Sequence, residues 1–446
     1  MKKILFAAAV AAALLSSCRQ KADYVANPYL YEYTGYLDAS YRHQFESIWQ
    51  GINSGYAFWD VDTVDWDARY SEYSEKLAEL EGANEDGSIS DDDLQAFYDG
   101  LAGDLIDHHM AVVVKNIATG SQIWVTPGEN EVSKRSCYHE PLDLDTAWED
   151  LSNISTVLGG TGVENAICAT ATIGGDETDV ISCLIKLPDG RYIPYLWQSG
   201  YDISEILPML AQYDPVPDSE ADPEGYQNYL AGVALDNYFT WVCGDPQRGG
   251  IPDEQLSGII LDNRSNSGGI LLDMNYVVGT YLTEPKTVLE SRSKNGVGRL
   301  DYAPWIPASA RPNGIYPSRD ITSKNVPYVI LQDCHSLSMG ELSGLGCRAT
   351  LPTSRIIGAR SYGGQGSLSM SLTPILNYGT FGDQAATDGH YVYIVNYATR
   401  LPGSEILEGK GTQPDVEVLV KDEGTIGQLK AGIEYITGRL DGNRLL

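Results

Sequence analysis

The sequence predicts an α/β fold built on βαβ units, with a helical N-terminal domain and a strand-rich middle region. Two apolar runs, at 258–262 and 326–333, are almost uninterrupted, as in strands covered on both faces of a parallel sheet, and a helical pattern follows each. Before residue 109, apolar residues recur at helical spacing, whereas residues 110–200 have the pattern of short strands and turns. These observations define the expected architecture.

The length of the chain indicates more than one folded unit. At 446 residues it exceeds what a single hydrophobic core usually serves. The predicted divisions are a leader at 1–18, a tether at 19–40, a helical domain at 41–109, a strand-rich region at 110–200 and an α/β core at 201–446.

Residue spacing supports the individual elements. Phe45, Ile48 and Ile52 share one helix face, and a second apolar stripe from Leu94 to Leu105 follows a cap at Ser90 or Asp91. The remaining expected elements are a strand at 110–116, a hairpin turn at 187–190, a strand at 192–197, a helix at 226–242 and a helix containing Met339, Leu342 and Leu345.

The first residues predict secretion and lipid attachment. MKKILFAAAVAAALLSSC has two lysines, a short alanine-rich apolar run and small residues leading to Cys18, which resembles a bacterial lipobox. We therefore expect a lipoprotein of the bacterial cell envelope, periplasmic or on the outer-membrane surface, that contacts the membrane only through a lipid on Cys18. The alternative is an ordinary secretory signal in which this cysteine is incidental. No later stretch is apolar enough to cross a bilayer.

Charge and cysteine spacing exclude several classes of function. A net charge of −31 opposes binding to phosphate backbones, so nucleic acid is not an expected partner. The six cysteines after Cys18 show no CxxC spacing, so the sequence suggests no zinc site, and we predict neither a metal nor another cofactor. Pairing of these thiols as disulfides stays open.

A candidate nucleophile lies in HSLSMGEL, residues 335–342. Ser338 follows a predicted strand and precedes a predicted helix, where free backbone amides such as that of Met339 can bind an oxyanion. A second donor is expected at Gly268 in LDNRSNSGG, because a residue without a side chain lets the backbone approach a ligand. The alternative role for Ser338 is a helix cap.

A serine hydroxyl needs a base, and several residues compete for the supporting roles. His109, at the expected junction of helix and strand, is the candidate base, and His108 is the alternative. His335 is close to Ser338 in sequence, but we expect it to face outward. Glu408 is the candidate acidic support for the imidazole, with Asp107 as a rival. Nearby, Glu341 is interpreted either as a functional glutamate or as a charge on the helix surface.

Four sequence blocks resemble those of the tail-specific, or carboxyl-terminal processing, serine peptidases. They are LDNRSNSGG (261–269), HSLSMGEL (335–342), IIGARSYGGQG (356–366) and EGKGTQPDVEV (408–418), and the segment 45–73 resembles the helical segment that precedes the catalytic part in bacterial members. The resemblance implies a core similar to ClpP and crotonase, peptide or protein substrates and no cofactor. It also raises the question of a PDZ domain near 115–187, which we expect to be divergent or absent.

Within that family, the chain resembles the branch of the tricorn protease core. In the other branch a lysine is the base, but Gly364 stands at its place and no lysine occurs between Lys324 and Lys410. The resemblance implies that Ser338 is the nucleophile, His109 the general base and Glu408 its support, with Gly268 and Met339 in the oxyanion hole. One departure is His108, which stands where the tricorn pattern has a serine.

Three functional classes follow from these patterns. The leading hypothesis is an endopeptidase or oligopeptidase that forms an acyl-enzyme on Ser338. The second is a catalytically inactive relative that binds peptides, motivated by the missing lysine and by His108. The third is a lipase or esterase of the α/β-hydrolase type, although SLSMG lacks the first glycine of the usual GxSxG motif.

Overall fold

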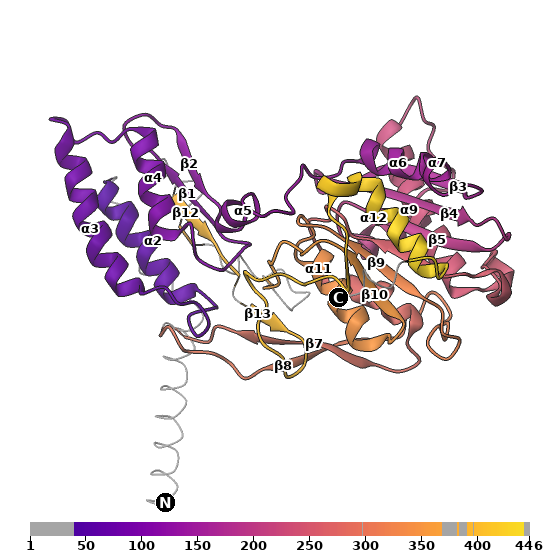
Figure 1. Cartoon of the computed structure of the whole chain (residues 1–446). Coiled ribbons are helices and arrows are strands. Elements are labelled where there is room, and N and C mark those ends of the chain that lie inside the picture. The colour runs from indigo at the N-terminus through magenta and orange to yellow at the C-terminus, as the bar shows by residue number, and fades with distance from the viewer. Residues whose placement is uncertain (1–39, 297, 368–380, 383–389, 396, 441–446) are drawn as a thin grey trace, which may run out of the picture. The chain divides into compact units, whose positions relative to one another are not determined.

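The computed structural model describes residues 40–296, 298–367, 381–382, 390–395 and 397–440 (Figure 1). Cys18, the leader and nearly all of the tether lie outside these residues. Among the helices that the structure describes, none has the length and apolar character that a bilayer crossing requires. The chain divides into two compact units, the first formed by 1–130, 292–305 and 366–398, and the second by 131–291, 306–365 and 399–446.

The first unit combines helices with a small sheet. Its helices are α2 (Tyr41–Gly55), α3 (Trp66–Ala83) and α4 (Asp91–Ala102). Its strands β1 (Ala111–Lys115), β2 (Gln122–Val125), β11 (Phe381–Gly382) and β12 (His390–Tyr393) are ordered β11-β12-β1-β2, and β1 is antiparallel to both of its neighbours. The predicted stripe of Phe45, Ile48 and Ile52 is fully buried. Ser90 caps α4, since its side chain accepts a hydrogen bond from the Asp93 amide.

The second unit is built on a seven-stranded sheet in the order β14-β10-β9-β6-β5-β4-β3. The strands are β3 (Gly162–Ile173), β4 (Asp176–Lys186), β5 (Tyr192–Gln198), β6 (Ile259–Asp262), β9 (Tyr328–Gln332), β10 (Ser354–Gly358) and β14 (Val416–Glu417). From β5 to β14 neighbouring strands are parallel, whereas the β3–β4 and β4–β5 pairs are antiparallel. The apolar runs predicted as covered strands are β6 and β9.

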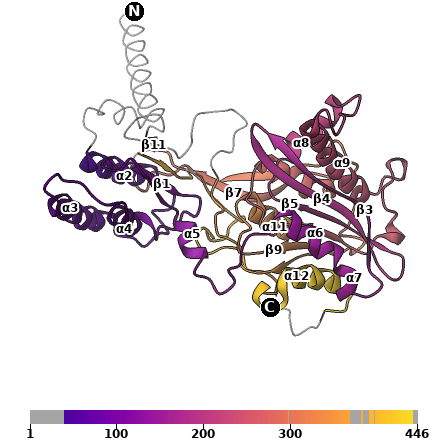
Figure 2. The same ribbon diagram turned by 90° about the horizontal axis from the view of Figure 1, so that it is seen from above.

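Helices cover both faces of this sheet, as Figure 2 shows. One face packs on α8 (Ile203–Met209), α9 (Pro223–Cys243), α10 (Met274–Val277) and α11 (Met339–Thr350), and the other on α6 (Leu144–Ser152), α7 (Ile154–Val157) and α12 (Val420–Ile436). The remaining elements are α5 (Pro127–Val132) and the strands β7 (Lys286–Ser293), β8 (Ile306–Ala310) and β13 (Tyr397–Arg400), which form a sheet in the order β13-β7-β8. The predicted α/β class with an N-terminal helical region is confirmed.

The predicted division at residue 200 does not separate two folded bodies. Strands β3, β4 and β5, which we assigned to a separate strand-rich region, continue the core sheet, because β5 pairs with β6 over Tyr195–Trp197. The division at residue 109 also differs from the structure, since β1 and β2 belong to the first unit. Strand pairing between segments distant in sequence leaves no signal in local periodicity, which explains both differences.

Candidate active site

Two loops at the carboxyl edge of the core sheet carry Gly268 and Ser338. They follow the neighbouring parallel strands β6 and β9, so both loops leave the sheet at the same edge, where ligands of such sheets collect. The Ser265 amide and hydroxyl donate to the Asp333 carboxylate over 2.9 and 2.8 Å. The Leu337 amide donates to the Asn266 carbonyl over 2.9 Å. The two loops therefore form one hydrogen-bonded structure.

Asn263 and Arg264, at the start of the loop that follows β6, fix this loop to the rest of the second unit. Arg264 is fully buried, and its guanidinium lies 2.9 Å from the Asp262 Oδ1 and 2.9 Å from the Asp150 Oδ2. Asn263 donates to the Gly340 carbonyl of α11 over 2.8 Å. Because a buried charge must be paired to be tolerated, these residues have a structural role that fixes the loop.

Ser338 occupies a strained turn directly before α11. Its φ of +56° and ψ of −121° are unusual for a residue with a side chain, and such strain typically costs about 1–3 kcal/mol. The Ser338 amide donates to the Gly364 carbonyl over 2.9 Å. Ser338 stands at the N-cap position of α11, but its side chain makes no capping hydrogen bond to the helix, so the hydroxyl does not serve as the cap that the alternative interpretation required. Ser338 as a whole is partly exposed.

The proposed oxyanion donors lie beside this serine. The Met339 amide opens the first turn of α11, where backbone N–H groups have no partner within the helix. Gly268 has a φ of +99°, and a Cβ at this position would lie 2.5 Å from the Ser338 Cβ. Only glycine fits here, as the sequence suggested. The Gly268 amide, however, donates to the Asn266 Oδ1 over 2.9 Å, so this donor is engaged by the protein itself.

A buried glutamate on α11 organises the glycine-rich loop. Glu341 is fully buried, and its Oε1 accepts from the Gly363 and Gly364 amides over 2.6 and 2.9 Å. Its Oε2 accepts from the Ser361 hydroxyl over 2.6 Å. Burial raises the pKa of the Glu341 carboxyl, although the Ser361 hydroxyl and the amides act in the opposite direction. The interpretation of Glu341 as a charge on the helix surface is therefore wrong.

Glu408 enters the same network from the other side. It is 2% exposed, and its Oε2 accepts from the Gln365 amide over 2.7 Å. The Gln365 side chain donates to Glu341 and to the Thr412 hydroxyl, each over 3.0 Å. Ser338 and Glu408 thus bind adjacent residues, Gly364 and Gln365. The structure brings Ser338, Gly268, Met339 and Glu408 together within the second unit.

Gln365 and Thr412 were missed as site residues in the sequence. Neither is charged, and neither has a recognisable place in a catalytic set. The one available signal was their position inside the SYGGQG and EGKGTQPDVEV blocks.

His109 belongs to the first unit, just before β1. Its amide donates to the Asp107 Oδ1 over 2.9 Å, and the Asp107 Oδ2 accepts from the Val395 amide over 3.1 Å. Asp107 therefore holds the backbone around the imidazole, which is a different role from the imidazole partner we considered. Among the described residues the buried Nδ1 of His109 finds no hydrogen-bond partner.

Burial sets the charge states in this segment. Burial, with a smaller contribution from the neighbouring His108, lowers the pKa of His109 to about 4. Burial also raises the pKa of Asp107 to about 7, against the backbone amides that donate to it. His109 is consequently a neutral imidazole near neutral pH, the form in which it can accept a proton.

His335, which is close to Ser338 in sequence, is held by contacts of its own. The Nε2 of His335 makes a short contact with the His139 carbonyl oxygen, and its ring packs edge-on against Tyr138 at 5.4 Å. His335 is therefore occupied by the segment that follows α5. His108 is 6% exposed in the first unit.

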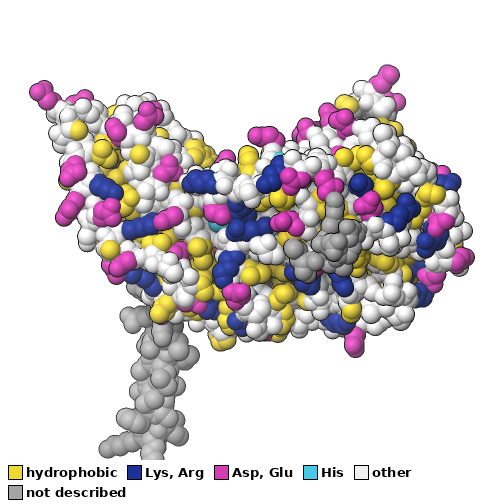
Figure 3. Space-filling view, viewed as in Figure 1, with side chains coloured by type: hydrophobic (Ala, Val, Ile, Leu, Met, Phe, Trp, Pro, Cys, Tyr) yellow, Lys and Arg dark blue, Asp and Glu magenta, His cyan; other side chains and the backbone are white. Residues whose placement is uncertain are grey.

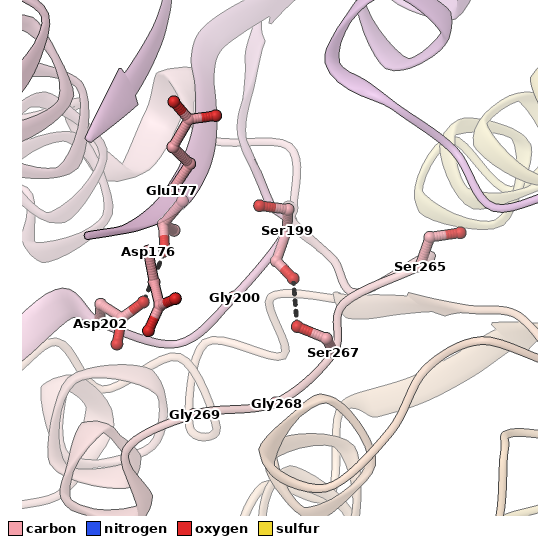
Figure 4. A pocket seen from close by; sticks show the side chains of 10 residues that line it. Asp176, Glu177, Ser199, Gly200, Asp202, Ser265, Ser267, Gly268 and Gly269 are labelled. Carbon is pink, nitrogen blue, oxygen red and sulfur yellow. Dashed lines mark hydrogen bonds between the residues drawn. The ribbon is translucent and has the colours of Figure 1, made fainter. Parts of the chain in front are cut away.

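A cavity of about 530 Å³ opens beside Gly268 (Figure 4). Its lining includes the acidic residues Asp176, Glu177 and Asp202, and within it the Thr178 hydroxyl donates to Asp202 over 2.6 Å. On the face of the molecule shown in Figure 3, acidic and basic side chains are intermixed, so the charge of the cavity comes from its own lining. The cavity therefore offers a negative potential next to the nucleophile loop.

Comparisons with known proteins agree with this geometry. The family model of peptidase family S41 matches residues 250–418, which contain Gly268, Ser338 and Glu408. No curated protein matches the chain in sequence. A solved structure described as a "putative peptidase" from Parabacteroides merdae ATCC 43184 has a TM-score of 0.54 at 16% identity, covering 89% of this chain and 96% of that one. At this identity the similarity shows a shared fold.

Two further solved structures were compared with the chain. They are mature CPAF complexed with lactacystin (TM-score 0.46, 11% identity, 88% of this chain and 96% of that chain) and the photosystem II D1 C-terminal processing protease (TM-score 0.38, 12% identity, 84% and 92%). The family match therefore makes residues 250–418 similar to the peptidases of family S41, and the solved structure from Parabacteroides merdae adds a shared fold.

Proposed function

We propose that this protein is a serine-type peptidase that cleaves peptide bonds of proteins or oligopeptides through an acyl-enzyme on Ser338. The observation that carries the proposal is the strained turn at Ser338. It presents a hydroxyl without a capping role at the start of a helix, in contact with a glycine at positive φ. This combination is typical of a nucleophile beside an oxyanion hole.

In the proposed reaction the Ser338 hydroxyl oxygen attacks the peptide carbonyl while a neutral His109 takes its proton. The Met339 amide, and the Gly268 amide once it leaves Asn266, donate to the oxyanion of the tetrahedral intermediate. His109 then gives its proton to the departing amine. Water, activated by the same imidazole, hydrolyses the ester on Ser338. Glu408 supports the imidazolium that forms in each step.

This reaction requires His109 of the first unit to reach Ser338 of the second. Three properties of the separate residues support that requirement. His109 is neutral near pH 7, its Nδ1 has no partner among the described residues, and Glu408 binds the residue next to Gly364, which holds the Ser338 amide. The missing lysine in SYGGQG is thereby replaced in function by an imidazole.

An inactive peptide-binding relative is the second candidate. The hydrogen bond from the Gly268 amide to Asn266 favours it, because an occupied donor cannot stabilise an oxyanion. The cavity beside Gly268 would then hold a peptide without cleaving it.

The setting of the reaction is the cell envelope in this proposal. The lipobox-like sequence that ends at Cys18 supports a lipid-anchored enzyme. Metabolic labelling with a fatty acid should mark the wild-type chain and leave Cys18→Ala unmarked.

The decisive experiment is covalent labelling combined with peptide hydrolysis. A fluorophosphonate should modify the wild type at Ser338, as located by peptide mass mapping, and the wild type should hydrolyse a peptide library. Ser338→Ala should lose both signals while its circular dichroism spectrum stays unchanged. Peptide binding without labelling or cleavage would support the second candidate, and cleavage that survives in Ser338→Ala would refute the first.

A further inference from the structure

A cluster of thiols and imidazoles lies beside the Ser338 loop, outside the proposed catalytic set. One ligand atom each from His139, Cys334 and His335 lie within 4.8 Å of one another. Cys334 and His335 follow β9 and precede Ser338, whereas His139 comes from the segment between α5 and α6. Both segments belong to the second unit.

A second thiol joins this cluster. Cys137, two residues before His139, makes a side-chain hydrogen bond with Cys334. This bond places the Cys137 sulfur next to the Cys334 sulfur, which lies within 4.8 Å of the ligand atoms of His139 and His335.

Hydrogen bonds to carbonyl oxygens fix the tautomers of both imidazoles. The His139 Nδ1 lies 2.7 Å from the Glu140 carbonyl oxygen, which can only accept, so Nδ1 carries the proton and the neutral ring has its lone pair on Nε2. The His335 Nε2 contacts the His139 carbonyl oxygen in the same way. Metal-binding histidines usually show this arrangement, with the second nitrogen donating to a carbonyl or carboxylate.

No hydrogen-bond donor among the described residues reaches the His139 Nε2. The side chain is 10% exposed, and among the described residues this buried nitrogen has no hydrogen-bond partner. The Asp333 Oδ2 lies 3.5 Å away but is an acceptor itself and already binds the Ser265 hydroxyl. A buried acceptor without a donor is unfavourable, and a cation between it and the neighbouring sulfur removes the cost.

From these contacts we infer that Cys137, His139, Cys334 and His335 form a binding site for a zinc ion. Two thiolates and two imidazoles are a ligand set typical of closed, tetrahedral, structural zinc sites. Such ligands lie roughly 3.3–3.8 Å apart when bond lengths are about 2.1 and 2.3 Å. The ligand atoms of His139, Cys334 and His335, which lie within 4.8 Å of one another, would therefore move closer by about 1 Å on binding, with Cys137 as the fourth ligand. The ion joins the segment after α5 to the loop that leads to Ser338.

The same thiols would also be positioned for a disulfide, but the contacts of the histidines favour metal. A disulfide between Cys137 and Cys334 uses neither imidazole and leaves the His139 Nε2 as an orphan acceptor. Spacing rules miss this site because its ligands come as C-x-H and C-H pairs, with His139 and His335 separated by 196 positions.

Metal analysis of the full chain tests the inference. Protein purified without chelator should contain about one equivalent of zinc, and cobalt(II) exchanged into it should give thiolate charge-transfer bands and the intense visible bands of a tetrahedral site. Cys137→Ser and Cys334→Ser should lose the charge-transfer intensity and bind zinc at least about tenfold more weakly. Cys168→Ser, a half-buried cysteine of β3, is the matched control and should keep both signals.

The cobalt spectrum is recorded on the wild type, so the test does not depend on whether a variant folds. Mass spectrometry under non-reducing conditions shows whether Cys137 and Cys334 are free or joined in a disulfide. A chain that binds no stoichiometric zinc or cobalt while its thiols are free would overturn the inference. So would a Cys137–Cys334 disulfide in protein isolated from the cell envelope.

Discussion

The two units hold their parts of the proposed active site in different ways. In the second unit, Ser338 and Glu408 lie in a dense network in which Glu341 alone accepts hydrogen bonds from two amides, a hydroxyl and a side-chain amide. In the first unit, His109 is held through its backbone by Asp107, and its Nδ1 has no partner among the described residues. The comparison teaches that the nucleophile is fixed within one fold, whereas the proposed base is contributed by another.

Loss of the nucleophile should have the largest effect on activity. Ser338→Ala is expected to lower kcat for peptide hydrolysis by about 10⁴-fold or more, because the acyl-enzyme cannot form. His109→Ala should cost about as much, and the double variant should be no slower than either single one, since the two residues act as a unit. Additive losses in steady-state kinetics would contradict the proposed coupling.

Removal of the Glu341 carboxylate, the central acceptor of the hydrogen-bond network in the second unit, should destabilise the protein. Glu341→Ala removes the acceptor of the buried Gly363 and Gly364 amides and of the Ser361 hydroxyl, so we expect a loss of about 3–5 kcal/mol in the free energy of unfolding. Urea unfolding measures it. Glu405→Ala, whose carboxylate pairs with Lys410 on the surface, is the control and should change stability by less than about 1 kcal/mol. Equal effects would show that Glu341 is not the centre of the network.

Substitution of Gly268 should separate activity from stability. In Gly268→Ala the added Cβ meets the Ser338 side chain and the backbone is strained at φ +99°, so we expect kcat/KM to fall by about 10²-fold or more. Gly190→Ala is the matched control, because Gly190 has φ +84° and open space around its Cα. It should lose about 1 kcal/mol of stability and keep its activity. Similar kinetics in both variants would remove Gly268 from the site.

The acid limb of the activity profile should reveal the buried imidazole. A base must be neutral to work, so kcat/KM rises with pH through the pKa of His109, which burial lowers to about 4. We therefore expect activity to persist at pH 5–6, where an ordinary histidine with a pKa of about 6.5 is largely protonated. Initial rates between pH 4 and 8 measure this limb. A half-maximum near the ordinary histidine value would contradict the assignment of a buried His109.

The charge of the acidic cavity should have the smallest effect on peptide cleavage. We expect peptides that place Lys or Arg near the scissile bond to be cleaved about 3- to 10-fold better than matched Glu peptides, with the preference reduced in high salt. Removing charge from the exposed Asp176 and Glu177 should narrow the ratio, whereas Glu254→Gln outside the cavity should leave it unchanged. If the ratio of cleavage rates between basic and acidic peptides changed neither with salt nor with these substitutions, the cavity would not bind the substrate.

The sequence predicted the main strands and the nucleophile loop of the second unit, but not the hydrogen bonds around Glu341 and Glu408. Apolar runs and glycine motifs located β6, β9, Gly268 and Ser338, because strand ends and tight turns have local signatures. The role of Glu341 and the contribution of Gln365 arise from contacts between loops far apart in sequence. No local pattern encodes such contacts.

In the first unit, local periodicity predicted α2, α4 and β1 correctly. The pairing of β1 with β12, nearly three hundred residues later, had no signal in the sequence. The predicted division at residue 200 was wrong for the same reason. The local pattern changes there, but the hydrogen-bonded sheet continues from β5 to β6.

The measurement that tests the central claim most directly is the rate at which a fluorophosphonate phosphonylates Ser338, with loss of fluoride, in the wild type, His109→Ala and His108→Ala. Because the His109 imidazole is the proposed base, its removal should slow labelling at Ser338 by about 10³-fold or more, while His108→Ala stays within about tenfold of the wild type. Labelling of His109→Ala at the wild-type rate would show that Ser338 does not depend on this histidine and would contradict the account.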